Sequence, residues 1–407
     1  MRLDTATVAV VGMARSGVAA AELLESKGAR VTRVDKKLGN QIPESFSGCD
    51  LIVLSPGVPA DLEELGGARQ RGIPVIGDLE LASWFLEGPI IGITGSNGKT
   101  TTTALTGHIL ARCGIQAQVG GNIGTPPCSM VATSRAGQWN VLELSSFQLE
   151  TIQRFRAQVG ACLNITPDHL DRHYTLERYA AAKARLFENQ TAEDFAVLNA
   201  DDPIMRDLAK SLKARVAWFS SREPFTTDVP LRGRHNLDNA TAAALIARQA
   251  GASDDRIREA IKSFPGVEHR LEFVRDLNGV AWYNDSKATN VDAAIKAIEA
   301  FPGRLWVILG GRDKNSDYAP LGPLLQDKAY GALLIGEAAG KIGQQVGGNV
   351  PAIFCVTLDR AVNEARARAR AQDTVLLAPA CASFDQFDNF EHRGREFKRL
   401  VRELHEA

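Results

Sequence analysis

Short apolar runs alternate along the chain with stretches in which apolar residues recur at helical spacing. In the first part of the chain this pattern predicts one helix, Val18–Lys27, which ends at Gly28. The predicted strands on either side are Thr7–Val11, Arg30–Asp35, Leu51–Leu54 and Pro74–Ile76. Strands that alternate with helices favour a parallel sheet with crossover helices.

The same alternation restarts in the middle of the chain. The strand Ile90–Thr94 leads through a glycine-containing loop into a helix over about Thr100–Arg112. The later predicted strands are Val141–Leu144, Val159–Leu163, Phe195–Leu198 and Arg215–Phe219, and the later helices are Asn236–Gln249 and Asp254–Phe264.

The last part opens differently, on a hairpin. The runs Leu271–Arg275 and Val280–Tyr283 flank Asn278-Gly279, a strong signal for a tight turn. Alternation then resumes, with predicted strands at Leu305–Leu309, Ala332–Ile335, Ile353–Val356 and Thr374–Ala378. Helices are predicted at Val291–Ala300, after each of the strands Ala332–Ile335 and Ile353–Val356, and at the end of the chain.

Two breaks, at Glu87-Gly88-Pro89 and Pro265-Gly266, divide the chain into three α/β parts. We predict domains at 1–87, 88–267 and 268–407: a Rossmann-like domain, a P-loop ATPase-type domain and a second Rossmann-like domain. The chain has 407 residues, which at ~150 residues per domain agrees with two to three domains.

Composition narrows the function classes. The 47 Lys and Arg residues balance 48 Asp and Glu residues, which argues against a nucleic-acid binder. No apolar run approaches the ~20 residues of a membrane helix, and no signal-peptide core is evident. The six cysteines lack CxxC pairing, which argues against a disulfide scaffold or a zinc site. We therefore expect a cytoplasmic enzyme without nucleic-acid or membrane partners.

The most informative segment is Thr94-Gly95-Ser96-Asn97-Gly98-Lys99-Thr100, which ends a strand and opens a helix. Its glycines allow backbone amides to surround a phosphate, Lys99 can reach the β- and γ-phosphates, and Thr100 can ligate Mg²⁺. The strict P-loop pattern has glycine where this chain has Ile93, so the segment is a variant P-loop. An ordinary glycine turn with a surface lysine is the alternative.

A second glycine-containing turn, Gly12–Gly17, also follows a strand and precedes a helix. It resembles a dinucleotide fingerprint with Ala14 at the middle position, and Asp35 ends the next strand, where ribose hydroxyls are usually bound. A structural turn without ligand, a nicotinamide cofactor and another nucleotide all remain open. Ser55-Pro56-Gly57 should lie at the same edge of the sheet.

Three residues in the middle part are candidate metal ligands. Glu143 ends a strand beside the P-loop, where a carboxylate commonly binds Mg²⁺, although a surface glutamate is the alternative. His169 is more simply a hydrogen-bonded loop residue. Lys183 lies among alanines; a buried neutral amine could take up CO₂ to form a carbamate, but a solvated helical lysine is commoner.

Other polar residues follow strands or open helices in the last part. Asn284–Asn290, Lys314 and Ala378–Phe387 all follow strands, so their two lysines, a threonine and a serine could bind a small dianion. Asp285 could hold a lysine or receive a proton, and we expect Cys381 to be a buried thiol. His235, Asn236, Asn239, His269 and Arg270 are individually explained as caps or surface residues.

Together, these segments resemble the Mur ligases, which form amide bonds with ATP in peptidoglycan precursor synthesis. The resemblance covers nearly the whole chain, through TGSNGKT, GGNIG, ELSSFQLE, NITPDHLDRH, YAAAKARLFENQ, GRHNLDNA, HR, NDSKATN, GGRDKNSDY and APACASFDQF in order. NDSKATN and PACASFDQF resemble the members that add D-glutamate to UDP-N-acetylmuramoyl-L-alanine through an acyl phosphate. The resemblance implies a monomer that uses ATP and two Mg²⁺ ions, for which Mn²⁺ can substitute.

The resemblance also implies roles for individual residues. Catalysis falls to Lys99, Glu143, His169 and carbamylated Lys183, and metal binding to Thr100, Glu143, His169 and Lys183. ATP would contact Gly95, Ser96, Asn97, Gly98, Lys99, Thr100, Thr101, Asn236, Asn239, Arg270 and Asp285. The UDP-linked substrate would contact Ser16, Asp35, Ser55, Gly57, Asn122, Ser145 and His169, and D-glutamate would contact Lys287, Thr289, Lys314, Ser383 and Phe390.

One departure concerns the uridine contacts. Lys36-Lys37 follows Asp35 where many family members carry Thr-Arg. Two other classes remain as competitors: a P-loop NTPase that moves or switches a partner, and a nicotinamide dehydrogenase. Release of ADP distinguishes them, because only a ligase requires both the UDP-sugar carboxylate and D-glutamate.

Overall fold

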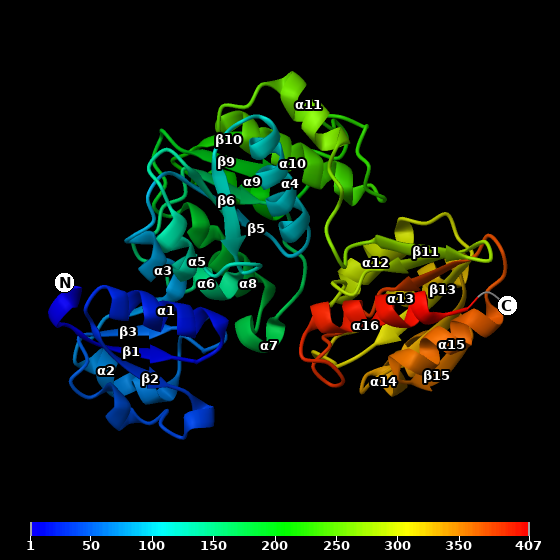
Figure 1. Ribbon diagram of the computed structural model, residues 1–407, viewed down its shortest axis with the longest axis horizontal. Helices are drawn as coiled ribbons and strands as arrows, with labels where there is room; N and C mark the ends of the chain where they lie inside the picture. Colours follow the sequence, from blue (N-terminus) through cyan, green and yellow to red (C-terminus); the bar gives the residue numbers. More distant parts are fainter. Residues whose placement is uncertain (1, 406–407) are drawn as a thin grey trace. The chain divides into compact units, whose positions relative to one another are not determined.

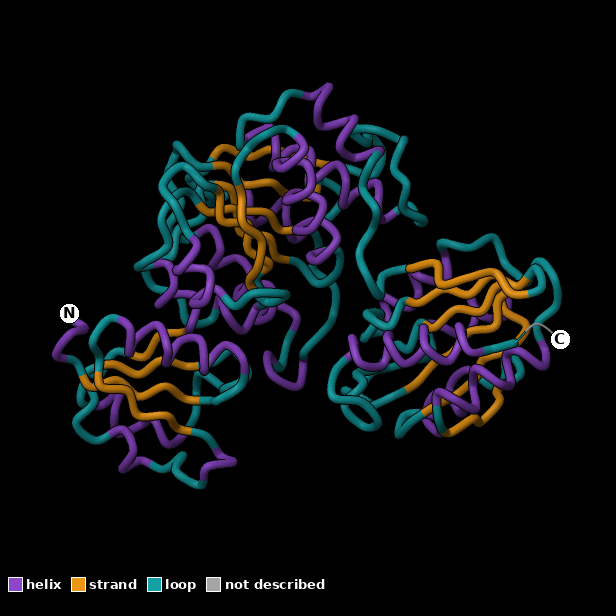
Figure 2. The backbone as a smooth tube through the Cα atoms, viewed as in Figure 1, coloured by secondary structure: helices purple, strands orange, loops and turns teal. Residues whose placement is uncertain are grey.

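Each of three separate sheets in the computed structural model, which describes residues 2–405, lies between helices (Figures 1 and 2). Contacts divide the chain into two compact units, residues 1–228 with 238–264 and residues 229–237 with 265–407. The first unit contains two of the sheets and the second unit contains one. This confirms the predicted α/β class, whereas the domain boundaries at 87 and 267 stay predictions.

The N-terminal sheet is parallel, in the order β2-β1-β3-β4. Its apolar residues form two core clusters, one on each face, because successive side chains of β1 point to opposite sides. The elements are β1 (Thr7–Val11), α1 (Arg15–Ser26), β2 (Arg30–Val34), β3 (Leu51–Leu54), α2 (Gly66–Gln70), β4 (Val75–Gly77) and α3 (Asp78–Ser83). Helix α1 starts at Arg15, before the predicted Val18, because its first residues are polar and lie outside the apolar pattern.

The central sheet is also parallel, in the order β10-β9-β8-β5-β7-β6. Its strands are β5 (Ile90–Thr94), β6 (Ala117–Gly121), β7 (Trp139–Glu143), β8 (Val159–Cys162), β9 (Phe195–Asn199) and β10 (Arg215–Phe219). Its helices are α4 (Lys99–Arg112), α5 (Pro127–Met130), α6 (Ser146–Leu149), α7 (Leu170–His173), α8 (Leu176–Ala184), α9 (Pro203–Ala209), α10 (His235–Gln249) and α11 (Asp254–Lys262). Strand β6 was not predicted, because its sequence AQVGG has little β propensity and pairing with β7 stabilises it.

The C-terminal sheet, in the order β11-β12-β16-β13-β14-β15, is parallel except for β11. Leu305, Val307 and Leu309 of β13 join one core cluster, and Trp306 and Ile308 join the other, so helices cover both faces. The strands are β11 (Glu272–Leu277), β12 (Val280–Asn284), β13 (Leu305–Gly310), β14 (Ala329–Ile335), β15 (Ala352–Val356) and β16 (Thr374–Leu377). The helices are α12 (Val291–Glu299), α13 (Leu321–Lys328), α14 (Ala339–Val346), α15 (Leu358–Arg368) and α16 (Phe390–Glu403).

A buried carboxylate connects the N-terminal and central sheets within the first unit. Glu80 on α3 is 0 % exposed and accepts hydrogen bonds from the backbone N–H groups of Gln153, Arg154 and Phe155 at 2.8–3.0 Å. The Trp84 indole N–H donates to the same carboxylate at 2.9 Å. Four donors therefore satisfy this charge, which secures the N-terminal sheet to the loop between β7 and β8.

No helix among residues 2–405 has the length and apolar character needed to cross a membrane.

Candidate functional site

The P-loop joins β5 to α4, as the sequence predicts. Gly95 has φ +146° and Gly98 has φ +86°, and a Cβ on Gly98 would lie 2.3 Å from the Asn239 side-chain oxygen. Only glycine fits both conditions at this position. The Ser96 hydroxyl donates to the Thr166 carbonyl at 2.9 Å, and the Asn97 N–H donates to Asn164 Oδ1 at 2.9 Å. These two hydrogen bonds fix the P-loop immediately before the first turn of α4.

Glu143, at the end of β7, lies beside the start of α4. The Thr100 hydroxyl donates to Glu143 Oε2 at 2.7 Å, and the Asn122 amide donates to Glu143 Oε1 at 2.9 Å. Glu143 is 1 % exposed. Strands β5 and β7 are neighbours in the sheet, which is why residues 43 positions apart along the chain meet here. The arrangement places hydroxyl and carboxylate oxygens together, the donor types that Mg²⁺ prefers.

Two lysines share one backbone carbonyl in this P-loop cluster, which we define as Lys99, Thr100, Glu143 and Lys183. Lys99 Nζ donates to the Gly95 carbonyl at 2.8 Å, and Lys183 Nζ donates to the same oxygen at 2.9 Å. Lys183 is 1 % exposed and its Nζ lies 4.6 Å from the centre of the Tyr179 ring. Burial, with the Lys99 ammonium as the second cause, lowers the pKa of Lys183 to about 7. Lys183 is thus a buried group and not a solvated helical lysine.

His169 begins α7 with a left-handed backbone, φ 54°. Its ring meets the Phe147 ring edge-on at 4.9 Å between centres, and its Nε2 lies 3.6 Å from Asp168 Oδ2. Its side chain is 34 % exposed, so it faces the surface of the first unit more than Lys183 does.

Thr101, on the first turn of α4, is fully buried.

A pocket of about 520 Å³ lies between the N-terminal and central sheets of the first unit. The predicted residues that line it are Ser16, Asp35, Ser55, Gly57 and Asn122. The Asp35 carboxylate accepts the Met13 N–H at 2.6 Å and the Lys37 N–H at 2.8 Å, and the first of these bonds is the main cause of its lowered pKa. Asp35 therefore fixes the Gly12–Ala14 turn as well as facing the pocket. Lys36 and Gln148 also line it, although neither was predicted as a site residue.

The sequence contains a local pattern that could have drawn attention to Gln148. Ser145 caps α6: its hydroxyl accepts the Gln148 N–H at 3.2 Å, while Gln148 Oε1 accepts the Ser145 N–H at 3.1 Å. This reciprocal pair is a capping box, whose pattern Ser-x-x-Gln is visible in residues 145–148. The side-chain amide nitrogen of Gln148 therefore points away from Ser145.

In the second unit, the segments after β12 and β16 gather several predicted residues. Lys287 Nζ lies 4.3 Å from the centre of the Phe390 ring. The Arg270 guanidinium lies 3.9 Å from Asp285 Oδ1, and burial raises the pKa of Asp285 to about 6 against the effect of Arg270. Ser383 is buried, whereas Thr289 and Lys314 are half-buried.

The two asparagines that the resemblance predicts to contact ATP are both buried. The Asn236 side-chain amide donates to the Arg232 carbonyl at 2.6 Å, in the second unit. Asn239 Oδ1 accepts from the Thr102 hydroxyl at 3.4 Å, in the first unit. Asn239 is thus beside the P-loop, as the close approach to Gly98 also shows.

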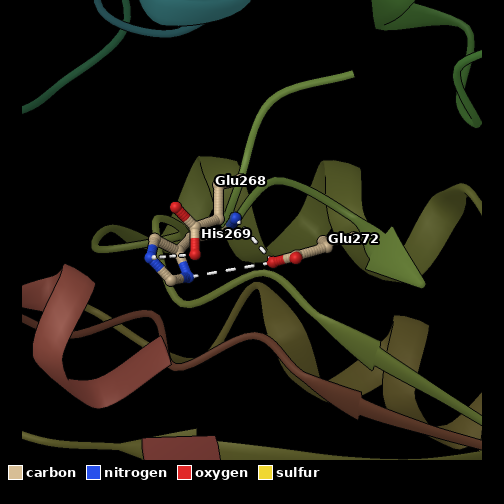
Figure 3. Close-up of side chains that lie close together, drawn as sticks. All are labelled: Glu268, His269 and Glu272. Atoms are coloured by element: carbon tan, nitrogen blue, oxygen red, sulfur yellow. Dashed lines mark hydrogen bonds and ion pairs between the residues drawn. The ribbon is translucent and has the colours of Figure 1, made fainter. Parts of the chain in front are cut away.

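A second group of potential ligand atoms is the Glu268 cluster, which we define as Glu268, His269, Glu272 and Lys398. Figure 3 shows Glu268, His269 and Glu272 turned toward one another, with ligand atoms within 4.8 Å. Lys398 Nζ already donates to Glu268 Oε1 at 2.5 Å and to Glu272 Oε1 at 2.9 Å. Lys398 thus forms ion pairs with both carboxylates and offsets one of their two negative charges, as in a structural ion-pair network.

A strand, a glycine loop and a helix that bring a lysine and a threonine beside a carboxylate define a P-loop α/β protein. Comparison with known proteins is more specific. Residues 93–224 match the Mur ligase middle domain, and residues 269–381 match the Mur ligase, glutamate ligase domain.

Two curated relatives are named UDP-N-acetylmuramoylalanine–D-glutamate ligase. The one from Solibacter usitatus is 55 % identical, over 99 % of this chain and 99 % of the relative. The one from Acidobacterium capsulatum is 48 % identical, over 98 % of this chain and 97 % of the relative. The chain therefore belongs to the Mur ligase family, which confirms the resemblance.

Solved structures agree on the fold. The MurF ligase from Thermotoga maritima in complex with ADP has a TM-score of 0.64 at 17 % identity, covering 99 % of both chains. The UDP-N-acetylmuramate–alanine ligase MurC from the same organism has a TM-score of 0.63 at 19 % identity, covering 98 % of this chain and 99 % of that one.

Proposed function

We propose that this chain joins D-glutamate to UDP-N-acetylmuramoyl-L-alanine, with ATP converted to ADP and phosphate. The observation that carries the proposal is the P-loop cluster of a Mur ligase chain, in which Thr100 donates to the Glu143 carboxylate and Lys99 donates to the Gly95 carbonyl. The names of the relatives from Solibacter usitatus and Acidobacterium capsulatum supply the substrate pair. We place the enzyme in the cytoplasm as a monomer.

The chemistry has two steps. The L-alanyl carboxylate oxygen attacks the γ-phosphorus of ATP, the bond to the β–γ bridging oxygen breaks, and an acyl phosphate and ADP form. The neutral amine of D-glutamate then attacks the acyl carbon, and phosphate leaves as the amide forms and the amine loses a proton. Lys99, which donates to the Gly95 and Ser96 carbonyls, is placed to exchange these acceptors for phosphate oxygens and to offset the repulsion between two anions.

The residues around the P-loop fit a divalent cation. Thr100 Oγ1 and Glu143 Oε2 are 2.7 Å apart, and oxygen donors of this kind suit Mg²⁺ and also Mn²⁺. A bound ion there would neutralise phosphate charge during the first step. We assign Thr100 and Glu143 to one ion, and His169 with Lys183 to a second.

Lys183 would join the second metal site as a carbamate. The ammonium first loses a proton; the neutral amine then adds to CO₂, an N–C bond forms and a second proton is released, so a cation becomes an anion with oxygen donors. Burial favours the neutral amine that this reaction needs. The change would also replace the like charges of Lys183 and Lys99 around one carbonyl by opposite charges.

The remaining assignments follow the three sheets. We propose that residues 1–87 bind UDP, with Ser16, Asp35, Ser55 and Gly57 in the pocket, while Asn122, Ser145 and His169 contact the muramoyl part. Residues 88–267 would bind ATP through the loop residues Gly95 to Gly98, Thr101, Asn236 and Asn239, with Arg270 and Asp285 from the next part. Residues 268–407 would bind D-glutamate through Lys287, Thr289, Lys314, Ser383 and Phe390.

The decisive test is release of ADP by the purified chain with each substrate omitted in turn. We expect ADP only when UDP-N-acetylmuramoyl-L-alanine and D-glutamate are both present, and little with a panel of other amino acids. ADP formed without either substrate would indicate a switch-type NTPase. A product formed without ATP would contradict the ligase assignment.

A further inference from the structure

A buried tyrosine joins two polar segments at one edge of the C-terminal sheet. Tyr318, between β13 and α13, is 0 % exposed, and its ring packs in the core cluster that β13 also joins. Its hydroxyl lies 2.8 Å from Asp313 Oδ1 in its own segment and 3.0 Å from Cys381 Sγ in the segment after β16. Phenylalanine would supply the same packing, so the buried hydroxyl calls for an explanation of its own.

The chemistry of these groups fixes the direction of each hydrogen bond. An ionised carboxylate only accepts, so the Tyr318 O–H donates to Asp313 and the Cys381 S–H donates to the Tyr318 oxygen. Burial raises the pKa of Cys381 to about 11, so the thiol keeps the proton that it donates. Lys341 Nζ, on α14, donates to Asp313 Oδ2 at 2.8 Å. Thiol, hydroxyl, carboxylate and ammonium thus form one chain of hydrogen bonds.

The segment after β13 is also held in one shape by contacts of its own. The Asp313 carboxylate accepts the Ser316 N–H at 3.0 Å across Asn315, which has a left-handed backbone with φ 59°. The Tyr318 N–H donates to Gln345 Oε1 at 2.8 Å. Because Gln345 and Lys341 both lie on α14, one helix secures the segment at two points.

The same segment is attached to the segment after β16 at both of its ends. At its start, the Arg312 N–H donates to the Ala382 carbonyl at 2.9 Å. At its end, the Tyr318 hydroxyl meets Cys381, as described above. Lys314 lies between these two attachments in the sequence. One backbone bond and one side-chain bond therefore fix the spacing of the two segments.

We propose that Tyr318 is a positioning residue for D-glutamate, which holds the segment that carries Lys314 against the segment that carries Ser383. The inference rests on the proposed function, in which Lys314 and Ser383 both contact that substrate. A small dianion that is bound from two segments requires their relative position to be fixed within about 0.5 Å. Tyr318 itself does not need to touch the substrate.

The test compares Tyr318→Phe with the unsubstituted chain. Phenylalanine keeps the buried ring and removes only the hydroxyl, so the bonds to Asp313 and Cys381 are both lost. We expect KM for D-glutamate to rise about fivefold, which equals about 1 kcal/mol, the net contribution of a typical hydrogen bond. The kcat value and the KM values for ATP and the UDP-linked substrate should stay within about twofold, because only binding of the amino acid is affected.

Two control variants separate positioning from loss of stability. Val346→Ala removes packing from the same core cluster, so it should lower the melting temperature at least as much as Tyr318→Phe and leave KM for D-glutamate unchanged. Tyr330→Phe makes the same substitution on β14, where the tyrosine is 46 % exposed, and should change neither quantity. An equal rise in KM for the Val346 variant would show that stability alone is responsible, and would overturn the proposal.

Cys381 allows a conservative rescue. Cys381→Ser keeps a donor for the Tyr318 oxygen and should retain KM for D-glutamate within about twofold, whereas Cys381→Ala should raise it about threefold. The double variant Tyr318→Phe with Cys381→Ala should resemble Tyr318→Phe alone, because both changes break the same contact. Full additivity, or an unchanged KM in Tyr318→Phe, would contradict the proposed role.

Amide hydrogen exchange of the full chain separates this proposal from the function on which it rests. Without any substrate, Tyr318→Phe should speed exchange in both segments, residues 311–318 and 380–384, measured by mass spectrometry. If the unsubstituted chain makes no product with D-glutamate, the proposed function fails, while faster exchange in both segments still supports Tyr318 as the group that joins them. If product forms and exchange after β16 is unchanged by the substitution, the role of Tyr318 alone is wrong.

Discussion

The P-loop cluster and the Glu268 cluster both combine carboxylates with lysines, but the two clusters differ in which groups the carboxylates and the ammonium groups contact. In the Glu268 cluster, Lys398 bridges two carboxylates at 2.5 and 2.9 Å. In the P-loop cluster, Glu143 accepts from a hydroxyl and an amide, while Lys99 and Lys183 both donate to one backbone carbonyl.

The comparison shows that carboxylate proximity alone is a poor guide to a metal site. Three potential ligand groups lie together in the Glu268 cluster, yet Lys398 already forms ion pairs with both of its carboxylates. In the P-loop cluster, Glu143 accepts from Thr100 and Asn122 while the two lysines donate to a backbone carbonyl, so under the proposed function phosphate and a cation could each take a partner of opposite charge. A binding site differs from a structural ion pair because its charged groups can exchange their present partners for a ligand at a low cost in free energy.

Lys183→Ala should have the largest effect. Removing the group that we propose to carry the carbamate should lower kcat about 10³-fold, as expected for loss of a preorganised electrostatic group. Short carboxylic acids at millimolar concentration should restore part of the activity, measured as ADP release. The matched control is Lys398→Ala in the Glu268 cluster, which should keep kcat within about twofold. Full activity of the Lys183 variant would contradict the carbamate.

Glu143→Gln and Glu272→Gln sharpen the contrast between the two clusters. The first keeps the shape but removes the charge of the metal site that we propose, so we expect kcat to fall about 10²-fold and the Mg²⁺ concentration for half-maximal activity to rise. The second should lower the melting temperature and leave the Mg²⁺ dependence unchanged. A Mg²⁺ dependence that moves with Glu272 instead would reverse our assignment of the two clusters.

Lys314→Ala tests whether the second unit contains a ligand site distinct from the Glu268 cluster. Loss of a cation that faces a substrate carboxylate should raise KM for D-glutamate about tenfold, equivalent to about 1.4 kcal/mol. The KM for ATP should change less. Steady-state kinetics with D-glutamate varied at saturating ATP measure this, and an unchanged KM for the amino acid would count against the pocket.

The smallest expected effects concern the free energy of unfolding. Its dependence on pH should differ between the two buried lysines, Lys183 and Lys398. The pKa of Lys183 is lowered from 10.5 to about 7, so between these pH values the unfolded chain binds more protons and stability rises with pH. In CO₂-free buffer, Lys183→Met should therefore be stabilised over the unsubstituted chain near pH 7, by a margin that shrinks toward pH 9.5.

Lys398 should behave in the opposite way. The Glu268 and Glu272 hydrogen bonds raise its pKa in spite of burial, so its contribution is fully present below pH 10.5 and is lost only as pH rises above its own pKa. Lys398→Met should lower the melting temperature by a nearly constant amount between pH 7 and 9.5. Differential scanning fluorimetry across that range measures both trends, and parallel curves for the two variants would refute the distinction.

The sequence predicted the scaffold better than the site. Strand β5 was predicted at its observed bounds, and the start of α4 within one residue, because an apolar run followed by glycine, lysine and threonine is a strong local signal. Strand β6 escaped prediction because it depends on pairing with β7. Helix α13 did as well, since it carries Gly322 and Pro323 in its first turn, where proline is tolerated.

The contacts that create the site are long-range and could not be predicted by reasoning from local patterns. Lys183 and the Gly95 carbonyl are 88 positions apart, and the burial that shifts the lysine pKa exists only after the central sheet forms. From local spacing alone, His169 was more simply a hydrogen-bonded loop residue and Lys183 more simply a solvated helical lysine. The structure separates them, because Lys183 is buried against Tyr179 whereas His169 is about a third exposed.

The Glu80 connection has a consequence for the size of molecule that the first unit accepts. Three backbone N–H groups of the central part donate to one α3 carboxylate, so the N-terminal sheet that forms one wall of the pocket is joined to the part that carries the P-loop. If the pocket binds the diphosphate as we propose, the distance from the pocket to the phosphate loop sets the length of substrate that can react. Shortened or extended substrates should then react poorly even when both ends carry the correct chemical groups.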